Sequence, residues 1–144
     1  MQVVRIPAEE TYPLRLLVLR PGGTVDDCRW PIDTVPDAFH LAVEKDGQRV
    51  CIASFQPSSH PALTATQAWQ LRGMATHPYH RGIGAGRLLV EHAIEQVRAL
   101  GTDLLWCNAR LVALPFYERL GFRTEGPEFD IAGIGPHYLM WRPV

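Results

Sequence analysis

A glycine-rich turn joins an expected strand to an expected helix within residues 71–89, which read LRGMATHPYHRGIGAGRLL. The strand extends from Ala68 to Thr76 and ends before His77-Pro78, because a proline disfavours a helical residue before it and cannot continue a ladder. The helix extends from Arg87 to Leu100 and stops at Gly101, where helices prefer glycine. Its apolar stripe consists of Leu89, Ala93, Ile94, Val97 and Leu100.

Two further elements are expected after this helix, followed by a final strand pair. The near-continuous apolar run Asp103–Asn108 has the length and character of a strand buried on both faces. A second helix, from about Ala113 to Leu120, tolerates Pro115 in its first turn and stops at Gly121. The remainder, from Phe122 to Trp141, predicts two strands joined through residues 132–136.

Before the glycine-rich turn, the sequence predicts a helix and a hairpin. Leucines between Ala8 and Leu19 follow helical spacing until Pro21-Gly22-Gly23. Residues 39–55 predict two strands around Asp46-Gly47, since glycine supplies the positive φ that a tight hairpin requires. These elements together predict an α/β (α+β) fold, a mixed sheet with helices on both faces.

Length and composition restrict the class of protein. A chain of 144 residues predicts one domain, residues 1–144. With Lys+Arg 14 against Asp+Glu 15, no excess positive charge favours binding to nucleic acid or to a membrane surface. Three widely separated cysteines form no metal or redox pair, and we expect no metal site. No signal peptide or apolar span is evident, so the expected location is cytoplasmic.

The glycine-rich turn has the chemistry of an anion site. The first N–H groups of a helix lack intrahelical partners and lie at the positive end of its dipole. Gly84 and Gly86 remove side chains that would obstruct an anion, and Arg81 adds a positive charge. A flexible turn without a ligand is the alternative. The sequence matches neither the Walker A motif nor the dinucleotide-binding motif. We therefore expect the turn to bind a phosphate or pyrophosphate in a different way from either motif.

Two motifs resemble those of the GCN5-related N-acetyltransferases (GNAT). Arg81-x-x-Gly84-x-Gly86, after residues 71–80 and before Leu88-Leu89, resembles motif A. Asn108-Ala109-Arg110, Ala113 and residues 116–122 resemble motif B at the usual distance. The resemblance covers about residues 69–124. It implies a mostly antiparallel sheet with a splayed parallel strand pair, and a small single-domain enzyme of bacterial type.

The resemblance also implies residues for binding acetyl-CoA as a co-substrate. Pyrophosphate would lie on the turn, and the pantetheine arm would bond to the strand backbone near Met74. Asn108 would contact the same arm, although a structural cap is the alternative. The full expected set is Met74, Ala75, Thr76, Arg81, Gly82, Ile83, Gly84, Ala85, Gly86, Arg87, Asn108 and Phe116.

Tyr117 and His137 are the expected catalytic residues. In family members with this tyrosine it is the general acid that protonates the departing thiolate, a suitable role for a phenol protonated at neutral pH. A purely packed tyrosine is the alternative. The strand from Ala68 to Thr76 has no Asp or Glu to serve as a base. His137 is the first candidate for that role, followed by His40 and Asp33, unless a water chain removes the proton or the amine arrives neutral.

The resemblance implies transfer of an acetyl or short acyl group to a primary amine of a small molecule or peptide by direct attack. Alternatives are a coenzyme-A-binding module without turnover and a protein-interaction subunit. We expect the acceptor pocket to be lined by the first helix, residues 25–37 and the last hairpin. Four acids could attract a cationic amine there, or could merely be solvated: Asp26, Asp27, Asp33 and Asp37. Dimers are frequent in this family, so a homodimer is also an open alternative.

Overall fold

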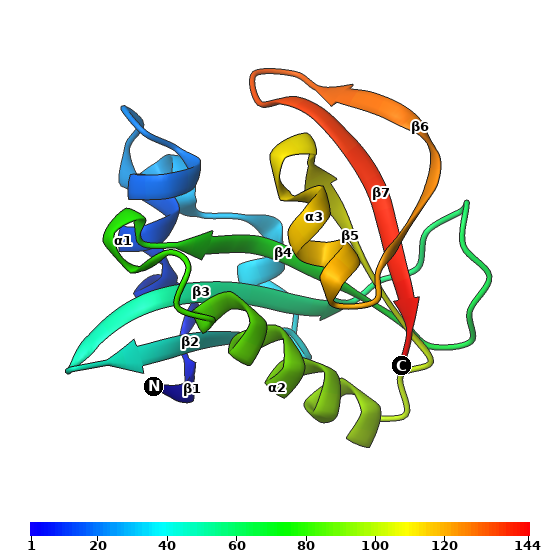
Figure 1. The fold of residues 1–144 in the computed structure, drawn as a ribbon, viewed down its shortest axis with the longest axis horizontal. Helices are drawn as coiled ribbons and strands as arrows, with labels where there is room; N and C mark the ends of the chain where they lie inside the picture. The colour runs from blue at the N-terminus through cyan, green and yellow to red at the C-terminus, as the bar shows by residue number, and fades with distance from the viewer.

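Figure 1 shows the computed structural model, which describes all residues 1–144. Seven strands form one sheet in the order β1-β2-β3-β4-β5-β7-β6. They are β1 (Gln2–Ile6), β2 (Phe39–Lys45), β3 (Gln48–Pro57), β4 (Ala68–Thr76), β5 (Leu104–Arg110), β6 (Arg123–Ile131) and β7 (Gly135–Pro143). Neighbouring strands are antiparallel except β4 and β5, which are parallel. The expected mixed sheet with one parallel pair is confirmed.

Helices cover both faces of this sheet. On one face, α2 (Ala85–Ala99) and α3 (Leu114–Arg119) share a core with β2 to β5 that includes Leu41, Val43 and Leu105. On the other face, α1 (Tyr12–Leu14) packs through Leu14 against Ala42 and Ile52. We call these the α2 face and the α1 face. No helix of the structure is long and apolar enough to span a lipid bilayer.

Short helical segments occur on the α1 face and in the connections between strands and helices. The 3-10 segment η1 (Ala8–Thr11) precedes α1, and the π-helical turn η2 (Arg15–Leu19) follows it. Four more 3-10 turns are η3 (Val25–Cys28), η4 (Pro31–Thr34), η5 (Pro78–His80) and η6 (Leu111–Ala113). The predicted helix at residues 8–19 is thus helical throughout, but it changes its hydrogen-bonding pattern twice.

Several details differ from the sequence predictions: for example, α2 starts at Ala85 rather than Arg87. Strand β1 was not predicted, although its Val3 pairs with Val43 of β2. Leu100 is exposed rather than part of the stripe of α2, because the helix ends at Ala99. Val90 is fully buried and completes the stripe instead. The hairpin of β2 and β3 and the final pair of β6 and β7 are confirmed.

Strands β4 and β5 pair over only part of their length. The pairing joins Ala68–Gln70 to Leu104–Trp106 and then stops. Beyond this point β4 stays with β3 and β5 stays with β7, so the two strands diverge toward their carboxyl ends (Figure 1). Backbone groups of residues 71–76 and 107–110 consequently border a gap in the ladder.

A bulge at Gly73 bends β4 beside this gap. The register with β3 shifts between Ile52 and Ser54, and Gly73 has a φ of +64°. A Cβ atom at Gly73 would also lie 2.6 Å from Cζ3 of Trp30. The position therefore requires glycine both for its conformation and for its close contact with Trp30.

Candidate active site

A cavity of about 960 Å³ lies where β4 and β5 diverge. Its wall includes the carboxyl-terminal halves of both strands, the glycine-rich turn, α3 and the β6–β7 hairpin. Residues 18–20 and Trp30 line it from the α1 face. A larger concavity, about 1190 Å³ and lined in part by Arg5, Asp37 and Trp69, contains no histidine, cysteine or tyrosine. The cavity between the diverging strands is therefore the candidate active site.

The glycine-rich turn contributes open backbone to this cavity. Gly84 is the N-cap of α2, with a left-handed φ of +84° and no side-chain cap. A Cβ atom at Gly82 or Gly84 would meet nothing within 4 Å, so the space above the turn is free. The first helical bond runs from the Leu88 N–H to the Gly84 carbonyl, at 3.0 Å. The free N–H groups before Leu88 and the open approach fit a diphosphate.

Most of the expected binding residues line this cavity. Eleven of the twelve do so, and Ile83 does not. The eleven are Met74, Ala75, Thr76, Arg81, Gly82, Gly84, Ala85, Gly86, Arg87, Asn108 and Phe116. Gly86 is closely packed, because a Cβ there would lie 3.1 Å from Met74 Cε and from the Phe116 ring. Ala75 directs its methyl group into the core on the α1 face, so its contribution to the cavity is backbone.

Asn108 does not occupy the end of its strand, because β5 continues to Arg110. Its side chain is exposed to the cavity and makes no hydrogen bond within the protein. The capping alternative has no support in this geometry, and the amide is free to bind a ligand.

Tyr117 reaches the cavity from the α2 face. Its ring packs against Phe116 and Phe122 at centroid distances of 5.0 and 5.3 Å. Burial raises the pKa of Tyr117 well above its ordinary value, and the neighbouring thiols of Cys107 and Cys51 act in the same direction. The phenol is thus protonated at neutral pH and can donate a proton but not accept one.

The buried thiols beside Tyr117 are poor nucleophiles. Burial raises the pKa of Cys51 to about 11, and it raises the pKa of Cys107 further. Since the thiolate is the reactive form, Cys107 is a core residue, as the sequence predicted.

His137 lies on the other side of the gap. It is buried, it stands directly across from Arg110 in the β5–β7 ladder, and it lines the cavity. Its Nδ1 lies 2.7 Å from the Gly135 carbonyl oxygen. An N–H at Nδ1 donates this bond and leaves Nε2 of the neutral ring as a proton acceptor. Tyr117 and His137 therefore approach the cavity from opposite faces of the sheet.

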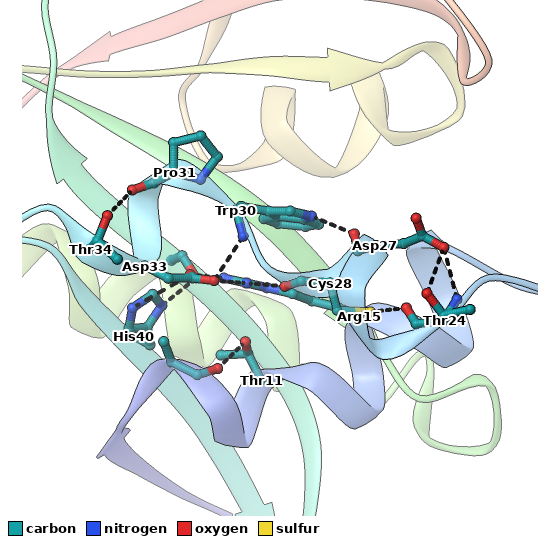
Figure 2. A network of polar contacts seen from close by, with 12 residues as sticks. Thr11, Arg15, Thr24, Asp27, Cys28, Trp30, Pro31, Asp33, Thr34 and His40 are labelled. Atoms are coloured by element: carbon teal, nitrogen blue, oxygen red, sulfur yellow. Dashed lines mark hydrogen bonds and ion pairs between the residues drawn. The ribbon is translucent and has the colours of Figure 1, made fainter.

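The other two candidates for a base, His40 and Asp33, belong to a buried network behind Trp30 (Figure 2). The fully buried guanidinium of Arg15 donates to both carboxylate oxygens of Asp33, at 2.8 and 2.9 Å, and to Ser54 Oγ. His40 Nδ1 lies 2.6 Å from the same Ser54 Oγ. Neither His40 nor Asp33 lines the cavity, so neither can reach an acceptor there.

The acids that could attract a cationic amine are also placed elsewhere. Asp26 pairs with Arg29, Asp27 accepts a bond from the Thr24 N–H, and Asp37 lines the other concavity. Asp33 is neutralised by Arg15 because the two side chains form a two-bonded pair. No aspartate or glutamate lines the candidate site. The alternative in which these acids attract a cationic amine to the cavity therefore has no support, whereas the elements expected to line the acceptor pocket do line the cavity.

Arginine residues line the cavity where acids were considered, and the sequence analysis did not identify them as site residues. Arg20, Arg72 and Arg110 line the cavity beside Trp30 and His137. Arg72 had a detectable signal, because it is the only charged residue of its strand. Arg15 had one too, since it interrupts a leucine-rich helix. Trp30 carried no signal, because only folding brings residues 30 and 73 together.

The two histidines before the turn lie beside each other. The rings of His77 and His80 are 5.4 Å apart, but His77 Nδ1 accepts a bond from the Tyr79 N–H. No group of three His, Cys, Asp or Glu side chains is placed to hold a metal ion.

The buried network makes the stability of the fold sensitive to acid. Burial lowers the pKa of His40, and the charge of Arg15 lowers it further. As the pH falls, His40 is therefore protonated in the unfolded chain before it is protonated in the folded protein. The contribution of neutral His40 to the stability of the fold is complete above about pH 6.5, the ordinary pKa of histidine. It is lost as the pH falls toward the lower pKa of His40 in the folded protein.

We expect the free energy of unfolding to fall between pH 7 and pH 5, by at most about 1.4 kcal/mol per pH unit from this one group. His40→Gln should reduce that slope, and the exposed His92→Gln should leave it unchanged. Urea unfolding at a series of pH values measures both. An equal slope in wild type and His40→Gln would contradict the assignment.

Comparison with known proteins agrees with this geometry. Residues 8–122, more than half of the chain, match the model of the Acetyltransferase (GNAT) family. An uncharacterised N-acetyltransferase of Bacillus subtilis (strain 168), YitI, is 40% identical over 142 residues, covering 99% of this chain and 95% of the relative. The streptothricin acetyltransferase of Streptomyces lavendulae is 34% identical over 89 residues, 60% of this chain and 44% of that protein.

Solved structures share the fold at low sequence identity. The ribosomal-protein-S18-alanine N-acetyltransferase of Escherichia coli superposes with a TM-score of 0.76 at 18% identity, covering 99% of this chain and 92% of that one. An aminoglycoside 6'-N-acetyltransferase complexed with coenzyme A gives a TM-score of 0.75 at 14% identity, with coverages of 99% and 97%. The chain therefore belongs to the acetyltransferase (GNAT) family and is an N-acetyltransferase.

Proposed function

We propose that this enzyme transfers an acetyl or short acyl group from acetyl-CoA to a primary amine of a small molecule or peptide by direct attack. The observation that carries the proposal is the cavity between β4 and β5, with the uncapped start of α2 on one side and Tyr117 beside it. The thioester supplies an activated acyl group, so no nucleophile of the protein is required.

The glycine-rich turn is proposed to hold the diphosphate of acetyl-CoA. Backbone N–H groups at the start of α2 would donate to it, with Arg81 and Arg87 nearby. The solved aminoglycoside acetyltransferase, whose fold this chain shares, contains coenzyme A, which supports the choice of ligand. The edge of β4 from Met74 to Thr76 that faces β5 is unpaired and would bind the pantetheine arm as an added strand would, and Asn108 and Phe116 border the same path.

Tyr117 is proposed as the general acid for the departing thiolate. Its raised pKa keeps the proton in place until the strongly basic thiolate develops. The bulged backbone near Met74 is proposed to donate to the thioester oxygen as negative charge develops there.

His137 is proposed as the general base for the acceptor amine. The Gly135 carbonyl fixes the proton on Nδ1, so Nε2 is the nitrogen available to take a proton. Its position on the face opposite Tyr117 allows one group to take a proton while the other gives one, without competing for the same space.

A screen of primary amines with acetyl-CoA, read by the release of free thiol, tests the proposal. Thiol release that depends on the amine, with the acetylated amine identified by mass spectrometry, is the expected result. Stabilisation by acetyl-CoA in a thermal-shift assay without thiol release across the panel would favour a binding module instead. The absence of both would contradict the proposed ligand.

A further inference from the structure

Three guanidinium groups without a carboxylate partner line the part of the cavity beside Trp30 and His137, which we call the acceptor side. Arg20, Arg72 and Arg110 all line it. The guanidinium carbons of Arg20 and Arg72 lie 5.2 and 5.4 Å from the centroid of the Trp30 ring. Burial lowers the pKa of both Arg72 and Arg110, and the charge of Arg20 lowers it further in each. Like charges are thus concentrated in one partly buried place.

The lack of carboxylate partners distinguishes these arginines from five others in the protein. Arg15, Arg29, Arg49, Arg87 and Arg98 each form an ion pair with a carboxylate. Arg20 donates only to the Leu19 carbonyl, and Arg72 and Arg110 donate no side-chain hydrogen bond. Since buried charges are normally paired, partly buried arginines without counter-ions facing a cavity indicate an anionic ligand.

The platform under this cluster is rigid. The Arg15 guanidinium stacks at 3.9 Å from the Trp30 ring centroid, and Asp33 binds both Arg15 and the Trp30 N–H (Figure 2). The indole N–H donates to the Asp27 carbonyl, which fixes the ring from its other end. The buried network therefore positions Trp30, and Trp30 positions Arg20 and Arg72.

The arginine cluster is separate from the expected site of the CoA diphosphate. Arg72 pairs with Ser54 in the β3–β4 ladder, and the Ser54 hydroxyl belongs to the Arg15 network on the α1 face. Arg110 alternates with Ala109, which packs in the core of the α2 face. The glycine-rich turn and Phe116 lie on that α2 face. The cluster and the turn thus approach the gap from opposite sides.

We propose that Arg20, Arg72 and Arg110 bind a compact oxyanion of the acceptor, so that the substrate is a small primary amine that also carries a carboxylate or a phosphate group. This inference rests on the proposed function and specifies its substrate class. The planar fork of arginine matches both oxyanions, and the absence of any acid in the cavity disfavours a polycationic acceptor. His137, across from Arg110 on the same wall, would then meet the amine end.

Matched pairs of acceptors test this inference in the intact enzyme. The panel contains amino acids and ω-amino acids, the carboxamide of each, phosphoethanolamine with ethanolamine, and spermidine. We expect the best anionic acceptor to exceed its neutral counterpart in kcat/KM by about tenfold or more, the scale expected for a charged, two-bonded contact. The carboxylate and phosphate pairs show which oxyanion the enzyme uses.

Substitutions in the arginine cluster test whether it causes the preference for anionic acceptors. Arg72→Gln and Arg110→Gln should each remove most of the preference for the anionic acceptor while leaving the KM for acetyl-CoA nearly unchanged. Arg123→Gln is the matched control, because Arg123 also stacks on a tryptophan, Trp141, but lies outside the cavity.

Each outcome decides the question. Thiol release with neutral amines or spermidine at rates equal to or above those of the anionic acceptors would overturn this inference and leave the proposed function standing. A loss of acetyl-CoA affinity in Arg72→Gln, without loss of the anion preference, would also overturn it. No thiol release with any amine would overturn the proposed function and this inference together.

Discussion

Gly86→Glu is expected to raise the dissociation constant for acetyl-CoA by about 100-fold or more, because it places a carboxylate where the diphosphate should bind. Gly86 is an α-helical residue without a positive φ, so the backbone itself accepts a side chain. A Cβ there would lie 3.1 Å from Met74 Cε and the Phe116 ring, and both side chains border the cavity. The new side chain therefore has to enter the cavity or displace its wall. Isothermal titration with acetyl-CoA measures the effect.

His92→Glu is the matched control for this variant. It adds the same charge to the same helix on an exposed face, outside the cavity. Its affinity for acetyl-CoA should remain close to that of the wild type, and circular dichroism should show both variants folded. Unchanged affinity in Gly86→Glu would remove the start of α2 from the binding site.

The part of the molecule that was predictable from sequence is the part determined by local rules. Strand β4 was predicted with its observed bounds, because Pro78 ends it after Thr76. The sequence placed the start of α2 at Arg87, two residues after the observed start at Ala85, although it identified the glycines that permit a left-handed N-cap at Gly84. These same glycines leave the N–H groups proposed to bind the diphosphate free. One stretch of chain thus indicates both the central strand–turn–helix unit and the proposed cofactor site.

The acceptor side was not predictable in the same way, because it depends on contacts between distant residues. Asp33 has the sequence context of a free loop acid, yet its partner Arg15 lies 18 residues earlier in the chain. The Ser54 hydroxyl that completes the network lies 39 residues after Arg15. Burial of this arginine is favourable only when both partners are present. An acid that seemed available to a substrate thus became part of the support for Trp30.

The positive charge of the cavity wall was not predictable from the sequence either. The net charge of −1 describes the whole chain and says nothing of how charges are distributed in the fold. Folding places acids in salt bridges and caps outside the cavity, while Arg72 and Arg110 reach it from two strands that diverge. The divergence is visible only in the topology, because the sequence shows each strand but not where their pairing stops.

Tyr117→Phe is expected to lower kcat by about 100-fold or more while leaving acetyl-CoA affinity nearly unchanged, in line with the loss of a general acid. The phenylalanine ring keeps the packing against Phe116 and Phe122 and removes only the hydroxyl. Because the pKa of Tyr117 is raised, the wild-type kcat should not decline through ionisation of this group up to about pH 10, the ordinary pKa of a phenol. Pre-steady-state thiol release and equilibrium titration separate turnover from binding.

Tyr138→Phe provides the comparison that isolates this effect. Tyr138 packs against the same core but does not line the cavity, so its hydroxyl can be removed without touching the reaction. Its kcat should match that of the wild type. Equal turnover in Tyr117→Phe and Tyr138→Phe would leave Tyr117 a packing residue, and thiolate protonation would then have to come from water. A parallel loss of affinity and kcat in Tyr117→Phe would instead assign the hydroxyl to binding, because a group that acts only on the departing thiolate has no effect on the complex before reaction.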